Sequence, residues 1–162
     1  IYDSPSLQKK AIEIFVKNKF KKPKKIKLEK IKNKKIKIGY YSSDFHNHAT
    51  MYLMANLFEL HDKNKFETYA YSFGPDDDSK IRKRVMKTFD KFFDVKSKTT
   101  KEIVHHSREL NLDIAVDLKG FTNNNRFDLF IERCAPIQLS YLGFPGTTSS
   151  DCIDYLLSLI HI

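Results

Sequence analysis

Short apolar runs alternate with amphipathic segments over most of this chain, beginning near Lys35. The runs have the length and composition of buried strands, and the segments between them repeat apolar residues at helical spacing. The pattern predicts strands at residues 36–41, 66–72, 91–95, 114–118 and 138–142. It predicts helices at residues 51–60, 79–89, 100–110 and 126–133.

Each predicted helix is preceded by a residue type that caps helices or favours their first turn. These signals are Thr50, the acidic run 76–78, Thr99 or Thr100 with Glu102, and Asn125. Strand and helix signals alternate with a period of about 25 to 30 residues, and parallel strands require such crossovers. We therefore predict an α/β fold, a Rossmann-like parallel sheet with helices on both faces.

The N-terminal region differs from the rest in pattern and in charge. Ser4 is placed to cap a short amphipathic helix that ends before Pro23, and residues 21–35 alternate lysine with apolar residues. Residues 1–38 hold 14 lysines against three acidic residues, whereas the remainder holds 15 basic and 17 acidic residues. We interpret residues 1–34 as a short helix and solvated basic linker; a polyanion-binding module is the alternative.

Residues 35–156 are predicted to form the folded domain. Residues 157–162, LSLIHI, match the translation of an adapter sequence used in sequencing libraries, so we interpret them as a non-native tail. We expect the natural protein to continue beyond this point.

The composition indicates in which cellular compartment the protein is expected and which partners are not. Cys134 and Cys152 have neither metal-ligand nor C-x-x-C spacing, which is typical of buried thiols in a reducing compartment. No apolar run approaches the roughly 20 residues of a membrane-spanning helix, and no signal-peptide pattern opens the chain. We expect a cytoplasmic protein without a membrane partner, and we do not expect a nucleic-acid partner.

Three polar turns follow predicted strands, at residues 42–50, 119–125 and 143–149. Ligands of open α/β sheets bind beyond the carboxyl ends of the strands, so these turns are expected to converge on one site. His48 has an imidazole that can act as a general base or as a neutral hydrogen-bond donor. His46 makes an H-x-H pair with it, but no third metal ligand is nearby, so we expect no metal. For His46 we favour a structural role, capping the following helix or packing on the sheet.

The other two turns carry candidates for binding an anionic ligand. Lys119 can meet a phosphate charge, Thr122 can donate to one, and Gly120 lets a ligand approach the backbone. A solvated turn is the alternative, with Arg126 paired to Asp117. Residues 143–150, GFPGTTSS, can expose successive backbone N–H groups as an anion nest. Neither a G-x-G-x-x-G nor a P-loop motif is present, which disfavours a dinucleotide oxidoreductase or a P-loop enzyme.

Four segments in this order carry a specific resemblance to a known family: KIGYYSSDFHNHAT, FETYAYSFGPDDDSKIRKRV, DIAVDLKGFTNNNR and APIQLSYLGFPGTT. They resemble the N-terminal half of the catalytic region of the O-linked N-acetylglucosamine transferase and SPINDLY family, over about residues 35–156. The resemblance implies the first half of a two-Rossmann-domain glycosyltransferase. It implies transfer of N-acetylglucosamine from UDP-N-acetylglucosamine to Ser or Thr hydroxyls of proteins, with inversion and without metal or cofactor.

The resemblance also implies roles for particular residues. His48 falls on the family's active-site histidine, and the other matching positions face the sugar donor or line the cleft between the two halves: Lys119, Gly120, Thr122, Gly143, Phe144, Pro145, Gly146 and Thr147. The partners implied are upstream tetratricopeptide repeats and a second catalytic half in the same chain. Because that half supplies most donor contacts, the 162 residues alone are expected to be inactive.

Two positions depart from the best-known animal members. Ala49 replaces a proline, and Lys119 replaces an asparagine, which is compatible with an ionic contact to the donor at that position. Either change is compatible with a different sugar, because SPINDLY proteins use GDP-fucose. An O-fucosyltransferase, or a glycosyltransferase with a lipid or glycan acceptor, is therefore an alternative.

Overall fold

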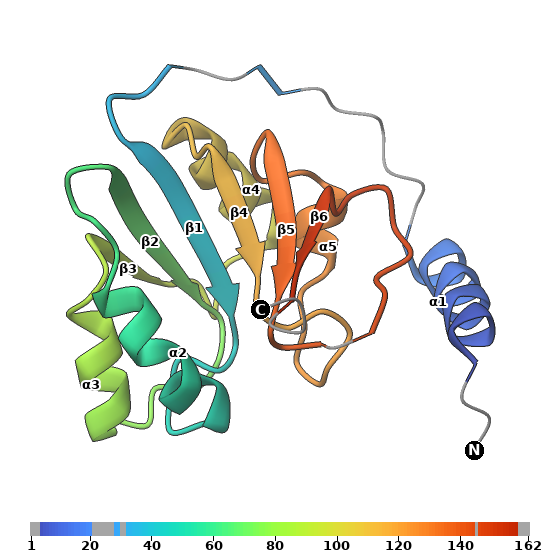
Figure 1. Ribbon diagram of the computed structural model, residues 1–162, viewed down its shortest axis with the longest axis horizontal. Coiled ribbons are helices and arrows are strands. Elements are labelled where there is room, and N and C mark those ends of the chain that lie inside the picture. The colour runs from blue at the N-terminus through green and yellow to red at the C-terminus, as the bar shows by residue number, and fades with distance from the viewer. Residues whose placement is uncertain (1–3, 21–27, 30–31, 145, 159–162) are drawn as a thin grey trace.

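Six strands, all parallel, form one sheet in the order β3-β2-β1-β4-β5-β6 (Figure 1). The computed structural model describes residues 4–20, 28–29, 32–144 and 146–158. The strands are β1 (Ile36–Ser42), β2 (Phe66–Ser72), β3 (Lys91–Asp94), β4 (Ile114–Asp117), β5 (Ile137–Tyr141) and β6 (Tyr155–Leu157). The Rossmann-like α/β architecture expected from the sequence is confirmed.

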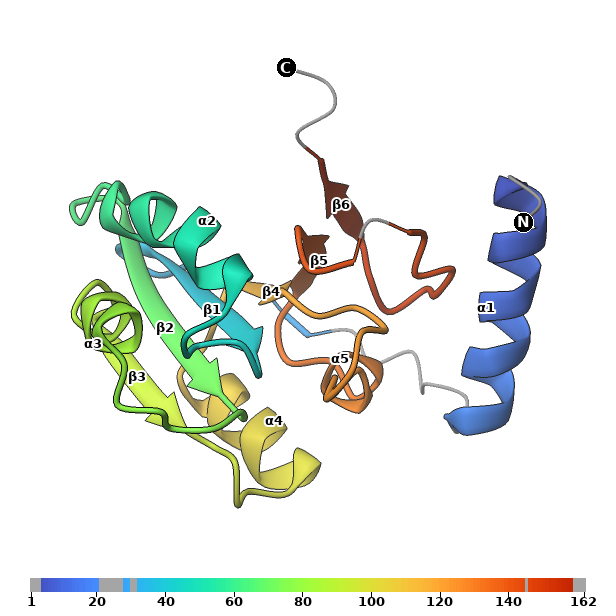
Figure 2. The ribbon, with the colours of Figure 1, turned by 90° about the horizontal axis from the view of Figure 1, so that it is seen from below.

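Helices cover both faces of this sheet. The helices are α1 (Pro5–Lys19), α2 (Ala49–Glu59), α3 (Lys80–Met86), α4 (Thr100–Glu109) and α5 (Asp128–Ile131). Helices α2 and α3 lie on one face and α4 and α5 on the other (Figure 2). Among the described helices, none is long and apolar enough to cross a membrane.

Alternation along the central strand divides the core into two layers. Tyr40 points to the layer under α2 and α3, where it packs with Phe58, and its neighbour Tyr41 points to the layer under α4 and α5. Tyr41 stacks on Tyr71 of β2 at 4.5 Å between ring centroids. Each layer excludes water from one face of the sheet, and this burial is the main driving force for the fold.

The predicted elements are all present, but one strand was missed and helices α3 and α5 are shorter than predicted. Strand β6 was not predicted, because a three-residue strand is too short to show alternation; it places Leu157, assigned to the tail, beside Tyr141. Helix α5 is shorter than predicted, and Arg133 just beyond it has a left-handed backbone with φ 63°. The interpretation of the tail itself stays a prediction, because residues 159–162 lie outside the described residues.

The helix starts differ from the predicted caps in three of four cases. Thr99 caps α4 in a capping box with Glu102, as expected. Ser79, rather than the acidic run before it, caps α3. His48, rather than Thr50, caps α2. Helix α5 has no side-chain cap, so Asn125 was also a wrong expectation.

The N-terminal region touches the domain at a few points. Ser4 caps α1 as predicted, and Phe15 and Phe20 of this segment pack against Phe121 and Phe127. The side chain of Asn33 donates hydrogen bonds to the Asn111 carbonyl and the Asp113 carboxylate. Contacts with the domain thus extend to the N-terminal side of the predicted boundary at 35, while most of the lysine-rich stretch lies outside the described residues.

Both cysteines are buried free thiols, as the sequence indicated. Burial raises the pKa of Cys134 to about 12 and that of Cys152 to about 11, so both are protonated and unreactive at neutral pH.

Candidate active site

The carboxyl ends of β1 and β4 lie side by side at the centre of the sheet, where the strand order reverses (Figure 1). Strands β2 and β3 extend to one side of β1, and β4, β5 and β6 extend to the other. This switch point is where open α/β sheets bind their ligands. The loops after β1 and β4 therefore flank the expected ligand position, and the loop after β5 is their neighbour.

The loop after β1 is held down by buried groups. The Phe45 side chain is fully buried in the layer under α2 and α3. Its backbone carbonyl accepts a 2.7 Å hydrogen bond from Nη1 of Arg82, which is itself buried and lies over the Phe92 ring. Asp44 N–H donates to Ser42 Oγ at 2.9 Å. The backbone before His48 is thereby fixed by contacts with β1 and α3 and by burial of the Phe45 side chain.

His48 stands at the start of α2 with 43% of its side chain exposed. Its Nδ1 accepts a hydrogen bond from Thr50 N–H at 3.2 Å and lies 3.1 Å from Thr50 Oγ1. The Asp44 carboxylate lies 3.7 Å from the same nitrogen. Because Nδ1 is occupied by the helix, Nε2 is the ring nitrogen left for a ligand.

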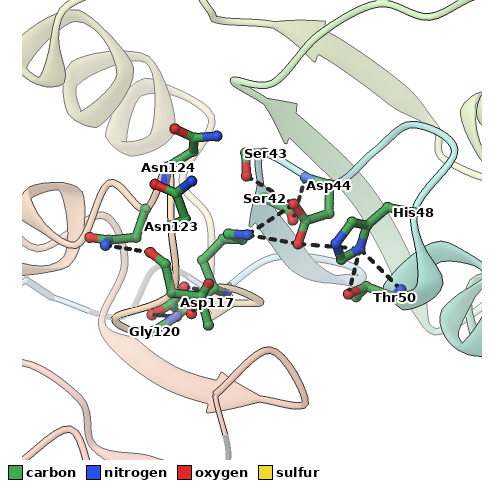
Figure 3. A network of polar contacts seen from close by, with 12 residues as sticks. Ser42, Ser43, Asp44, His48, Thr50, Asp117, Gly120, Asn123 and Asn124 are labelled. Carbon is green, nitrogen blue, oxygen red and sulfur yellow. Dashed lines mark hydrogen bonds and ion pairs between the residues drawn. The ribbon is translucent and has the colours of Figure 1, made fainter.

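Asp44 and Lys119 form a buried ion pair between the loops after β1 and β4. Lys119 Nζ lies 2.9 Å from both carboxylate oxygens, and each side chain is only 8% exposed. Figure 3 shows Asp44 beside His48, so this carboxylate contacts both the imidazole and the Lys119 amine. The amine that the sequence suggested for a phosphate is therefore directed at Asp44, and the pair joins two loops 75 residues apart in sequence.

A tight turn at the end of β4 presents the next candidates. The Asp117 carboxylate accepts hydrogen bonds from Lys119 N–H at 2.8 Å and Gly120 N–H at 3.0 Å. Burial raises the pKa of Asp117 to about 6, against the effect of these two hydrogen bonds. Gly120 has φ 52°, which favours glycine, and Thr122 Oγ1 donates to the Lys119 carbonyl at 2.8 Å. Arg126 contacts Lys98 and Thr100 instead of Asp117, so the alternative pairing was wrong.

The loop after β5 packs directly on this turn. A Cβ added to Gly143 would lie 1.7 Å from the Leu118 carbonyl oxygen, and one added to Gly120 would lie 2.3 Å from Phe144 Cβ. These glycines are therefore required by close contact between the two loops. The three turns predicted to converge are therefore brought together. The turns after β4 and β5 pack against each other through their backbones, and the Asp44–Lys119 pair joins the turns after β1 and β4.

The remaining candidates of the third turn lie farther along the same loop. Gly146 is near Gln8 of α1 and the Phe144 ring, and Thr147 Oγ1 accepts a hydrogen bond from Ser149 N–H at 3.1 Å. Pro145 lies outside the described residues. Whether any of these groups contacts a sugar donor stays a prediction.

Sequence reasoning missed two carboxylates of this site, Asp44 and Asp117. A signal existed for each: Asp44 is four residues before His48, and Asp117 is the last residue of a strand at the switch point. His46, the other imidazole of the loop, lies 5.6 Å from the His48 ring, measured between centroids. The cap role suggested for His46 belongs to His48.

In the part of the chain that the structure describes, no three His, Cys, Asp or Glu side chains are grouped so that they could hold a metal ion. The absence of a metal requirement in catalysis remains an expectation.

Comparison with known proteins decides the family. Residues 4–160 match the sequence description of glycosyl transferase family 41. The chain belongs to this family. It is 36% identical over 125 residues to a probable UDP-N-acetylglucosamine–peptide N-acetylglucosaminyltransferase, SEC, of Arabidopsis thaliana, covering 77% of this chain. It is 33% identical over 126 residues to the SPINDLY protein of the same plant, covering 76% of this chain.

The fold of this family 41 chain is also that of a solved relative. A mutant of the O-GlcNAc transferase of Thermobaculum terrenum superposes with a TM-score of 0.86 at 25% identity, over 94% of this chain and 30% of its own. The chain spans 13% of the length of the SEC protein and 14% of the SPINDLY protein. It thus corresponds to a small part of these proteins.

Proposed function

We propose that this chain forms the first half of the catalytic region of a protein glycosyltransferase. The complete enzyme would transfer N-acetylglucosamine from UDP-N-acetylglucosamine to Ser or Thr hydroxyls of proteins, with inversion. The observation that carries the proposal is the position of His48: a half-exposed imidazole at the switch point of a family 41 Rossmann sheet. The names of the SEC and O-GlcNAc transferase relatives support this donor and a peptide acceptor.

The reaction proposed is a direct displacement at the anomeric carbon. The acceptor hydroxyl attacks while the bond to the nucleoside diphosphate breaks, and the second half of the enzyme stabilises the departing diphosphate. In this proposal His48 Nε2 is directed toward the position where donor and acceptor would meet. It can hold or orient a substrate oxygen there, since Nδ1 is engaged with the start of α2.

His48 is tested by two substitutions in the complete protein. We expect His48→Ala to lower turnover at least about tenfold, a bound below the roughly hundredfold to ten-thousandfold that loss of a positioned acid or base typically costs. Because His48 caps α2, this variant is also expected to lose about 0.5–2 kcal/mol of stability. Transfer of labelled sugar to peptides and urea unfolding measure the two effects.

His48→Asn is the matched control, because asparagine caps helices well but cannot reach as far as Nε2. We expect it to keep the stability of the wild type and to show the same loss of turnover as His48→Ala. Full activity in either variant would show that the imidazole is not needed for the reaction.

Donor and acceptor are tested in the same assay. UDP-N-acetylglucosamine and GDP-fucose are offered in turn, each with peptide and with glycan acceptors. Transfer from UDP-N-acetylglucosamine to peptide is expected. Transfer only from GDP-fucose, or only to a glycan, would replace the proposed substrate.

We further propose a cytoplasmic enzyme that needs neither metal nor cofactor, with tetratricopeptide repeats upstream and the second Rossmann half downstream. A polyanion-binding module is not favoured, because the chain belongs to glycosyl transferase family 41 and its relatives are named as N-acetylglucosaminyltransferases. Most of the lysine-rich stretch to which the sequence assigned such a module lies outside the described residues.

A further inference from the structure

The hydrogen bonds of His48 determine which of its nitrogens carries the proton. Thr50 N–H can only donate, and it points at His48 Nδ1 at 3.2 Å. Nδ1 must therefore present a lone pair, and the neutral ring bears its proton on Nε2. In this form the exposed nitrogen is a hydrogen-bond donor and cannot accept a proton.

A competing arrangement is available nearby. Asp44 Oδ2 lies 3.7 Å from the same Nδ1 and could accept a proton from it after a small movement. Nε2 would then carry the lone pair and could act as a base, as imidazoles oriented by a carboxylate do. The two arrangements exclude each other, because Nδ1 holds either a proton or a lone pair.

Lys119 favours the first arrangement. Its ammonium group lies 2.9 Å from both oxygens of Asp44, and Ser43 Oγ donates to Oδ1 at 3.0 Å. With 8% exposure on each side, water hardly screens this pair. The carboxylate is therefore neutralised by Lys119 and is a poor acceptor for the ring (Figure 3).

The other charged groups near the loop do not compete for His48 Nδ1. Asp77 accepts a hydrogen bond from Asn47 N–H at 2.7 Å, and the His46 ring lies edge-on to that of His48. Asp44 is the carboxylate in contact with His48 among the described ion pairs.

We propose that Lys119 is a positioning residue for His48: by holding the Asp44 carboxylate, it keeps the proton of the neutral His48 ring on Nε2. The exposed nitrogen then donates a hydrogen bond to a substrate oxygen instead of removing a proton from the acceptor. The inference deepens the proposed function, on which the role toward substrate rests. The proton position itself is a property of this chain and is measured without substrate.

The test is the histidine tautomer in the ¹⁵N-labelled chain, read from long-range ¹H–¹⁵N spectra at a pH where the ring is neutral. His48 is assigned by its loss in His48→Asn. We expect the Nε2–H form in the wild type. In Lys119→Met the freed carboxylate should accept Nδ1–H, and the tautomer ratio should shift by at least about tenfold toward Nδ1–H.

His61 provides an internal reference for the opposite tautomer. Its Nδ1 lies 2.9 Å from the Leu57 carbonyl, which can only accept, and its Nε2 faces the Tyr40 hydroxyl at 2.9 Å. It should show Nδ1–H in every folded variant. In Asp44→Asn/Lys119→Met, which lacks both charges, His48 should return to Nε2–H.

Two results would overturn the proposal: an Nδ1–H form of His48 in the wild type, or an unchanged tautomer in folded Lys119→Met. Should Lys119→Met lose the His61 reference signal and so be unfolded, Lys119→Gln replaces it. The glutamine keeps one hydrogen-bond donor for Asp44. We therefore expect a smaller shift of the His48 tautomer ratio in the same direction, and an unchanged ratio would count against the proposal. Failure of the sugar-transfer assay would leave the tautomer result unaffected.

Discussion

The Asp117 carboxyl lies at the end of β4 with its side chain turned back onto its own turn. It is 3% exposed and binds two backbone N–H groups, yet burial raises its pKa to about 6. In the unfolded chain an aspartate titrates near 3.8. The folded state therefore takes up a proton at a higher pH than the unfolded state.

This difference predicts a pH dependence of stability. Since the folded pKa is raised, the contribution of Asp117 is fully present below pH about 4 and is lost as the pH rises through about 6. The loss amounts to about 3 kcal/mol if the whole shift is realised. Urea unfolding of the wild type and of Asp117→Asn between pH 4 and 7 measures it.

Asp117→Asn should remove this slope, because the amide does not titrate. The difference in unfolding free energy between variant and wild type should then move in favour of the variant as the pH rises. Parallel curves for the two proteins would show that Asp117 does not titrate in this range. The pKa of Asp90 is lowered, so Asp90 titrates below this pH range and does not contribute to the slope.

At the scale of the elements, the loops after β4 and β5 behave as one unit. Gly143 N–H donates to the Tyr141 carbonyl at 2.7 Å, and its Cα faces the backbone of Leu118. Backbone cannot move aside as a flexible side chain can. The shape of the edge near Lys119 therefore depends on the absence of a Cβ at this glycine.

We predict that Gly143→Ala destabilises the chain by at least about 2 kcal/mol, as overpacking against backbone does. Gly146→Ala is the control in the same loop, since its Cβ would meet the ends of Gln8 and Phe144 side chains. We expect less than about 1 kcal/mol there, as for most surface changes. Urea unfolding measures the loss of stability in each variant. Equal losses would contradict the close contact between Gly143 and the Leu118 backbone.

At the scale of the molecule, α1 lies outside the sheet, beyond β6 and α5 (Figure 1). None of its described residues is fully buried. Its contacts include the Phe15–Phe121 and Phe20–Phe127 ring pairs, at 5.6 Å and 5.8 Å between centroids. The helix thus covers loops of the candidate site without belonging to the central core.

Removal of residues 1–32 is therefore predicted to leave a cooperatively folded domain. Two aromatic pairs are lost, which costs about 1–3 kcal/mol. The cut keeps Asn33, whose side chain binds Asp113. Thermal and urea unfolding measure the loss, and Phe15→Ala/Phe20→Ala in the whole chain should match it. A truncated chain without a cooperative transition would show that α1 is part of the core.

The local pattern of residues was sufficient to predict β1 to β5, the alternation with helices and the parallel sheet, but not the three-residue β6. Period-2 and period-3.6 repeats act within about ten residues, and parallel pairing follows from the length of the crossovers. The loop 42–50 was located for the same reason, since it directly follows a clear strand. The motifs within it and after β4 and β5 also carried the family resemblance, which family 41 membership confirms.

The partners within the site could not be predicted, because they are set by the order of strands in space. Asp44 and Lys119 meet only because β1 and β4 are neighbours, although five elements separate these strands in sequence. The burial that raises the pKa of Asp117 and the choice of His48 as the cap of α2 likewise depend on packing from distant residues. Sequence thus predicts which groups reach the edge of the sheet, whereas packing determines which of them are paired, buried or left for a ligand.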